Sequence, residues 1–195
     1  FLCRGTHIEA IIDIEAEDYA LAYYVYAFPG QRGVTRECPI APGDFIVLAS
    51  DAIDHGIVSG ACLDLSGADW EFFNPTSGDY DNLDVPNLEP VTNVGNDFTM
   101  NLGHEAIWLS TGEEWNFGMH FDGNSEKEYA EIKIWTIVDG VEYSRSADSR
   151  KYLTVRVDAG LGGNGLSKYS ARSIQRRFPG LDSNNSTFDF EINDP

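Results

Sequence analysis

Short apolar segments, many with alternating polar and apolar positions, recur along the chain, and glycine, asparagine or aspartate separates them. Alternation places every second side chain on one face of a sheet, so the pattern predicts β-strands of ordinary length. Asp139-Gly140 lies between two such segments and predicts a hairpin, because a type I′ turn needs positive φ at both central positions. The expected strands are 44–49, 98–102, 105–110, 114–121, 131–138 and 152–157, with a last edge strand at 188–193.

Helical patterns are sparse. Residues 8–25 mix alanine, glutamate and isoleucine and fit one helix or two strands equally well. Residues 66–73 and 170–177 could each hold a helical turn, and residues 74–96 predict a long, turn-rich loop. No internal repeat or change of composition divides the sequence, so we expect a single domain over residues 1–195. The fold class expected from this pattern is an all-β, antiparallel β-sandwich decorated by the long loop.

The charge of the chain is strongly negative, with 32 acidic and 13 basic residues and a formal net charge of −19. Such a field repels phosphate backbones and excludes non-specific nucleic-acid binding over the whole surface. Eight of the basic residues lie in 145–177, where we favour internal pairing with acidic neighbours over an anion site. No apolar run reaches the roughly 18 residues of a membrane helix, so no transmembrane segment is expected.

Catalytic signatures are missing from the sequence. Neither a GxSxG nor an HExxH motif occurs, so we expect no enzyme activity. The glycines of 160–165 match GxGxxG, but no helical pattern follows them as a dinucleotide site would need. Cys3, Cys38 and Cys62 fit no zinc spacing. One disulfide with one free thiol and three free thiols both remain open.

The loop residues Asp79, Asp81 and Asp84 form a candidate calcium site, because Ca²⁺ prefers carboxylate oxygens at alternating loop positions. The run lacks the glycine and the final glutamate of an EF-hand, and Pro90 stands where that glutamate would be. Aspartates that cap their own turns are the alternative. Apart from this structural Ca²⁺, we expect no cofactor.

Aromatic side chains in the same part of the chain form a candidate ligand-binding surface. Trp70, Phe73 and Tyr80 could stack on sugar faces, while nearby aspartates and asparagines bind hydroxyl groups. Packing in the core of a sandwich is the alternative for each of them.

Three segments of the chain together resemble parts of a known kind of domain. PGDFIVLASDAIDH (42–55) resembles a Pro-Gly turn leading into a strand that ends in Leu-Ala, and FTMNLGHEAIWLSTG (98–112) resembles the next hairpin. ARSIQRRFPGLDSNNSTFDFEINDP (171–195) resembles the closing stretch. The insertion at 64–88 narrows the resemblance to a lamin-tail-like, uncharacterised family of exported lipoproteins of Gram-negative bacteria. It covers most of 28–195, whereas the first strands of the family have no match here.

The resemblance implies an immunoglobulin-like sandwich, export, and an outer-membrane or cell-surface location through a lipid anchor on a segment outside this chain. That family has no assigned catalytic residues. We therefore expect a non-catalytic surface module for binding or scaffolding, with a glycan or an outer-membrane or surface protein as its partner. The alternatives are a Ca²⁺-stabilised adhesion or structural domain and, on the abundance of Asp and Glu alone, a glycan-active hydrolase.

Overall fold

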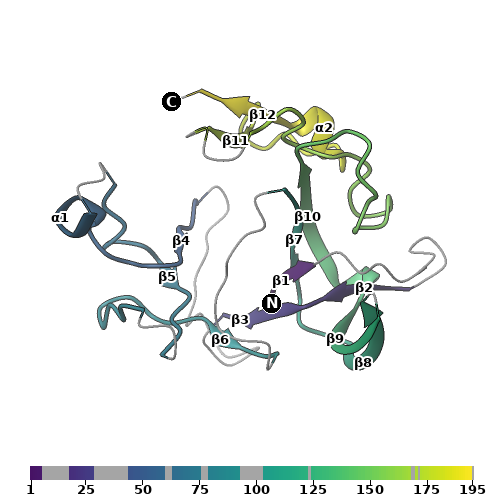
Figure 1. Cartoon of the computed structure of the whole chain (residues 1–195), viewed down its shortest axis with the longest axis horizontal. Coiled ribbons are helices and arrows are strands. Elements are labelled where there is room, and N and C mark those ends of the chain that lie inside the picture. The colour runs from purple at the N-terminus through teal and green to yellow at the C-terminus, as the bar shows by residue number, and fades with distance from the viewer. Residues whose placement is uncertain are drawn as a thin grey trace. The chain divides into compact units, whose positions relative to one another are not determined.

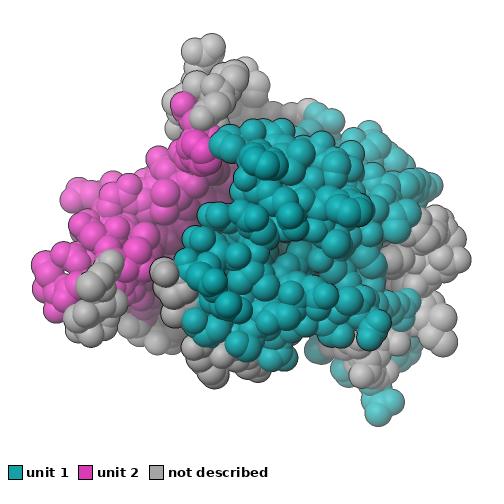
Figure 2. All heavy atoms as spheres, turned by 90° about the horizontal axis from the view of Figure 1, so that it is seen from above, with its two compact units in different colours: residues 1–25, 100–195 teal, residues 26–99 magenta. Residues whose placement is uncertain are grey.

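The computed structural model describes residues 1–5, 18–28, 44–59, 63–75, 79–92, 103–122, 124–167, 170 and 172–194. Contacts divide the chain into two compact units, residues 1–25 with 100–195 (unit 1) and residues 26–99 (unit 2), which Figure 2 colours separately. The elements, labelled in Figure 1, are β1 (Leu2–Gly5), β2 (Tyr19–Ala22), β3 (Tyr24–Ala27), β4 (Leu48–Ala49), α1 (His55–Ser59), β5 (Trp70–Glu71), β6 (Glu89–Pro90), β7 (His104–Ser110), β8 (Trp115–Asp122), β9 (Ser125–Lys133), η1 (Ile134–Thr136), β10 (Ile137–Ser144), β11 (Ser173–Arg176), α2 (Ser186–Asp189) and β12 (Phe190–Asn193).

Most of these elements are strands in antiparallel sheets, and the helices are short. The all-β expectation is confirmed. The expectation of a single domain stays a prediction, because contact units alone do not decide whether they fold separately. None of the helices in the described ranges is long and apolar enough to span a membrane.

One sheet of unit 1 is built around β7. The order of the sheet is β10-β7-β1-β3-β6, and both neighbours of β7 pair with it antiparallel. Trp108 of β7 lies opposite Cys3 of β1 and is almost fully buried. Cys3 is a buried free thiol, and burial raises its pKa to about 12, so the thiol stays protonated at neutral pH. Cys38 and Cys62 lie outside the described residues.

The second sheet of unit 1 has the order β2-β9-β8 (Figure 1). β8 and β9 form a hairpin with eight consecutive antiparallel pairs, from Trp115 opposite Ile132 to Asp122 opposite Ser125. Ala20 of β2 lies opposite Ile132, and both are buried in the core. In a third sheet, β11 pairs antiparallel with β12. The short helix α2 directly precedes β12 in the chain, and the Asn185 side chain caps its first turn by accepting a hydrogen bond from the Thr187 N–H.

The predicted hairpin turn at Asp139-Gly140 is wrong. Both residues lie inside β10 and pair with Leu109 and Trp108 of β7. A Cβ atom at Gly140 would lie 3.0 Å from Leu153 Cδ1 and 3.1 Å from Trp108 Cβ. The glycine therefore serves the close approach of core side chains rather than a turn.

The predicted strand 131–138 is interrupted by η1, which separates β9 from β10. The predicted strand 152–157 is wrong, since these residues form turns. The N–H groups of Tyr152 and Leu153 donate to the Glu142 carboxylate, so they are not available to a strand partner.

Other elements were predicted in part. Residues 105–110 and 114–121 match β7 and β8, but only Leu48–Ala49 of the segment 44–49 is strand. Residues 19–22 and 24–27 are strands, so the end of the segment 8–25 is β-strand rather than helix. Within 66–73, a turn forms at Ser66 and Gly67 and is followed by β5 rather than by a helix. β11 lies within 170–177, α2 precedes β12 within 188–193, and 98–102 lies outside the described residues.

Unit 2 contains short strands and long turns. β4 and β5 pair in parallel, and the last two residues of β3 pair with β6. A small core gathers Ala49, Ala52, Ala68 and Val85, with Leu65 packed against it. Aspartate and asparagine side chains close the turns by accepting from the backbone N–H two residues later, as Asp54 does from Gly56 and Asp64 from Ser66.

Candidate functional site

Unit 2 has an unbalanced charge. Its described residues include no lysine or arginine, so their carboxylates have no strong cation among them. The acidic residues in these ranges number ten: Asp44, Asp51, Asp54, Asp64, Asp69, Glu71, Asp79, Asp81, Asp84 and Glu89. Charges of one sign that are not neutralised within a unit project a field to which cations and basic surfaces respond.

Glu71 of β5 belongs to this group and is fully buried. Its Oε2 accepts from the Ala52 N–H at 3.0 Å and its Oε1 from the Asn82 N–H at 2.8 Å. Burial raises the pKa of Glu71, the two backbone N–H groups oppose that rise, and the charges of Asp81 and Asp79 add to it. The carboxylate thus ties two loops together through their backbones.

Asp79 and Asp51 share a hydrogen bond between their side chains. Burial and this bond raise the pKa of Asp79, while the Asn74 N–H, which donates to Asp79 Oδ2 at 3.1 Å, lowers it. Two oxygens of this group, Asp51 Oδ1 and Asn87 Oδ1, are buried without a hydrogen-bond partner. Buried oxygens of this kind are costly unless something donates to them or binds them.

The three aspartates of the predicted calcium site are only partly brought together. Asp79 and Asp81 both act on Glu71, and Asp81 Oδ1 accepts from Asn87 Nδ2 at 3.0 Å. Asp84 is exposed, and its N–H is held by Asn82 Oδ1 at 3.1 Å. Within the part of the chain that the structure describes, no group of three or more Asp, Glu, His or Cys side chains is arranged to hold a metal ion.

The predicted aromatic residues occupy different environments. Trp70 is 7 % exposed and packs edge-to-face on Phe28 at 5.2 Å between ring centroids. Phe73 is half-buried, and Tyr80 is 63 % exposed. Of the three, Tyr80 alone presents most of its ring to solvent, and Leu83 nearby in the chain is 90 % exposed.

A second charged group lies in unit 1 and was missed by sequence reasoning. The fully buried Glu142 carboxylate receives His104 Nε2 at 2.7 Å and Lys151 Nζ at 2.9 Å, besides the N–H groups of Tyr152 and Leu153. The ring of His104 stacks on Tyr152 at 3.9 Å. The sequence offered one signal for this group, the charged Glu142 among the apolar positions of β10. Its partners could not be predicted, because they are distant in sequence.

Asp158 extends this group. It is buried, accepts from the Ser186 hydroxyl at 2.7 Å and the Glu142 N–H at 3.0 Å, and lies 3.6 Å from Lys151 Nζ. Beside it, a pocket of about 260 Å³ opens between the glycine-rich loop and α2. No helix follows these glycines, because 161–167 form an isolated bridge and turns.

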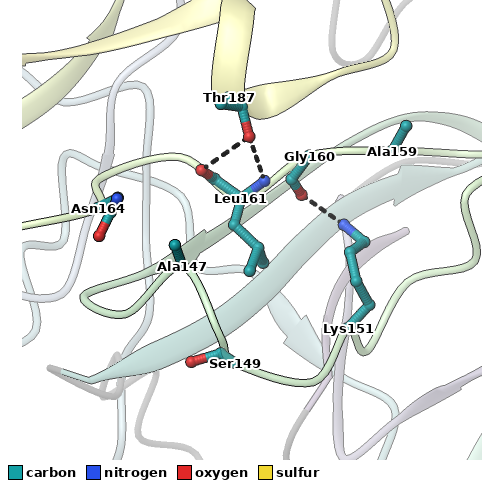
Figure 3. Close-up of a pocket in the computed structure, with 8 residues that line it drawn as sticks. All are labelled: Ala147, Ser149, Lys151, Ala159, Gly160, Leu161, Asn164 and Thr187. Carbon is teal, nitrogen blue, oxygen red and sulfur yellow. Dashed lines mark hydrogen bonds between the residues drawn. The ribbon is translucent and has the colours of Figure 1, made fainter.

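Two of the polar side chains that line the pocket, Lys151 and Thr187, are bonded to the protein itself (Figure 3). Lys151 Nζ donates to the Gly160 carbonyl at 2.5 Å. The Thr187 hydroxyl accepts from the Leu161 N–H at 2.9 Å and donates to the Leu161 carbonyl at 3.2 Å. With its cation held by Glu142, Asp158 and Gly160, this pocket is better suited to stabilising the fold than to binding a charged ligand.

A family model for a protein of unknown function, DUF4876, matches residues 41–195. The chain belongs to this family. The expectation of an uncharacterised family is thereby confirmed. No curated protein matches the chain at a significant level.

The crystal structure of a DUF4876 family protein from Bacteroides thetaiotaomicron VPI-5482 matches the present fold with a TM-score of 0.75. The two are 22 % identical, and the match covers 97 % of this chain and 59 % of the other. This chain therefore spans about three fifths of the length of the DUF4876 protein of known structure. At this identity the similarity shows a shared fold.

Proposed function

We propose that this DUF4876 protein is a non-catalytic binding module that uses the acidic surface of unit 2 to hold a partner protein. The observation that carries the proposal is the set of ten carboxylates without a lysine or arginine in the described residues of unit 2. Exposed apolar side chains, among them Tyr80 and Leu83, alternate with aspartates along the sequence of this unit. Apolar contacts supply affinity at interfaces, while opposite charges speed and orient encounter.

The charge favours a basic polypeptide over a glycan. Neutral sugars gain nothing from a negative field, and sugars with carboxylates or sulfates are repelled by it. A glycan would also need exposed aromatic faces, and Trp70 of the three predicted aromatics is buried against Phe28. The partner is therefore a protein surface that presents lysine and arginine around an apolar centre.

Site-specific photo-cross-linking in the native host tests this function. A benzophenone side chain replaces Leu83 in unit 2 or, as the control, Val155, which is 51 % exposed in unit 1. We expect one covalent adduct with a second polypeptide from position 83 and none from position 155. Tyr80→Ser should weaken the adduct without changing the melting temperature. Equal adducts from both positions, or none from either, would contradict the proposal.

A second candidate function is a structural domain stabilised by Ca²⁺. It is supported by the hydrogen-bonded pair Asp51 and Asp79 and by the two buried oxygens that lack a donor, one of them on Asn87. A cation that binds the folded state at hundredfold excess over Kd stabilises it by about 2.7 kcal/mol. Thermal melts with Ca²⁺ and with EDTA should then differ, Asp79→Asn should abolish the difference, and Asp84→Asn should leave it intact. Identical melts would remove this candidate.

We further propose that the all-β chain is an immunoglobulin-like, lamin-tail-like sandwich, exported and held at the cell surface by a lipid anchor outside the present sequence. The support is the resemblance of segments 42–55, 98–112 and 171–195. Metabolic labelling of the natural full-length protein with an alkyne fatty acid, followed by protease treatment of intact cells, tests both points. Labelled protein that is digested on intact cells is the expected result, and unlabelled or protected protein contradicts it.

A further inference from the structure

β8 presents a row of exposed apolar side chains. Trp115, Phe117, Met119 and Phe121 occupy alternate positions, which a strand places on one face. The last three are 44 %, 56 % and 57 % exposed. Trp115 packs edge-to-face on Phe117 at 5.0 Å and anchors the row to unit 1 through Phe1 at 5.7 Å. We name these four side chains the β8 stripe.

The same strand is the edge of its sheet. In the order β2-β9-β8, β9 is the neighbour of β8, and no other described residue forms backbone hydrogen bonds with β8. Natural edge strands are commonly protected by a charged residue, a proline or a bulge. β8 contains no proline, its register with β9 is regular, and its one acidic residue, Asp122, stands at its end, outside 115–121. Among the residues that the structure describes, the outer side of β8 is thus unpaired and can accept a further strand.

Acidic residues surround the β8 stripe. Glu128 and Glu126 of β9 lie opposite Met119 and Phe121 on the same face, and both are exposed. Glu114, also exposed, precedes the strand. This border favours a partner that carries lysine or arginine beside its apolar residues. A second copy of the chain fits poorly, because each copy has a net charge of −19 and the two borders would repel each other.

We propose that β8 is a docking edge for an extended, lysine- or arginine-bearing segment of another polypeptide, which adds to the sheet as a fourth strand. The backbone of the segment would supply hydrogen bonds to the free edge of β8, and its alternate apolar side chains would lie beside the β8 stripe. This surface lies in unit 1 and is independent of the acidic surface of unit 2, so it adds a second interaction to the proposed function.

Synthetic peptides test the proposal directly with the purified chain. The first peptide has about nine residues with alternating valine and threonine and two lysines at each end, matching the length of a strand. The second replaces the lysines by glutamates, and the third carries N-methyl groups on the backbone positions that would face β8. Fluorescence anisotropy should show saturable, salt-sensitive binding of the lysine peptide, with at least about tenfold weaker binding of the other two.

Variants on the two faces of β8 locate the binding. Met119→Ser should weaken the lysine peptide by about tenfold, because it interrupts the centre of the stripe. Asn116→Ser is the matched control, since Asn116 is exposed on the opposite face of the same strand, and it should change binding less than about twofold. Thermal melts confirm that both variants fold.

Five results would overturn the proposal. Equal binding of the N-methylated peptide would show that no strand is added, and equal binding of the glutamate peptide would show that the acidic border has no role. Equal weakening by the two variants would place the binding elsewhere. If none of the peptides bound, no segment of this kind would occupy the edge. If sedimentation showed a dimer that Met119→Ser dissociates, a second copy of the chain would be the occupant.

Discussion

The two units treat a buried carboxylate in opposite ways. In unit 1, Glu142 receives His104, Lys151 and two backbone N–H groups. In unit 2, Glu71 is equally buried but receives two backbone N–H groups, and the charges that act on its pKa are those of Asp81 and Asp79. Burying a charge is costly unless it is paired. The charges of unit 1 are thus balanced within the fold, whereas those of unit 2 remain uncompensated among the described residues.

Whether a charge is paired within the fold decides how strongly it can attract an external partner. A charge that is already paired has little attraction left for an external partner, so the pocket beside Lys151 offers little to a ligand. Uncompensated carboxylates cost folding energy but attract basic surfaces and cations. The buried charges of unit 1 are therefore paired within the fold, whereas the proposed binding of a partner rests on the unpaired carboxylates among the described residues of unit 2.

Breaking the buried group of unit 1 should give the largest effect. Glu142→Ala leaves Lys151, His104 and the N–H groups of Tyr152 and Leu153 without their acceptor. Removing one partner of a buried ion pair costs about 3–5 kcal/mol. Urea unfolding should show a correspondingly lower midpoint. Glu142→Gln, which keeps an acceptor oxygen, should lie between the variant and the natural protein. An unchanged midpoint for Glu142→Ala would mean that unit 1 does not depend on this group.

Alkaline titration should give the next effect, again in unit 1. Burial, followed by the charges of Glu105 and Glu142, raises the pKa of Tyr152 to about 12. Because the folded state holds this proton more tightly than the unfolded chain, its contribution to stability is complete below pH 10 and is lost as pH rises toward 12. Tyr152→Phe should reduce the loss of stability between these values, measured by urea midpoints at each pH. Identical pH profiles would contradict this assignment.

Long alternating segments were predictable, and positions fixed by distant contacts were not. β7 and β8 have patterns that a strand alone explains. Gly140 was read as a turn because the Asp-Gly pair is a strong local signal, but the core side chains of Leu153 and Trp108 need the space of its missing Cβ. Residues 152–157 have a strand pattern, yet the Glu142 carboxylate takes two of their N–H groups.

The candidate site was predictable to a similar extent. Asp79 and Asp81 were found because they alternate within one loop. Asp51 and Asn87 come from other parts of the chain, and only the fold brings them into the same unit beside Glu71. The one local signal for Glu71 was a carboxylate between the aromatic residues Trp70 and Phe72. A buried charge at such a position shows that its partners matter, but not which partners they are.

The smallest effect should come from Glu71→Gln in unit 2. Its side chain can still accept one of the two backbone N–H groups and no longer buries a charge, so the free energy of unfolding at pH 7 should change by about 1 kcal/mol or less. The sign of its pH dependence is distinctive. The raised pKa of Glu71 means that the folded state is favoured on acidification, and this gain is lost as pH rises through the folded pKa.

Asp189 of unit 1 provides the contrast for this last measurement. Burial alone would raise its pKa, but bonds from the Ser183 hydroxyl and N–H and the Asn185 N–H outweigh burial and lower it. Its contribution is therefore present at neutral pH and lost as pH falls. As pH falls from 7 toward 4, Glu71→Gln should become less stable relative to the natural protein. Asp189→Asn should become relatively more stable only as pH falls further, below about 4. Urea midpoints that shift in the same direction for both variants would show that the two units do not differ in how they hold a carboxylate.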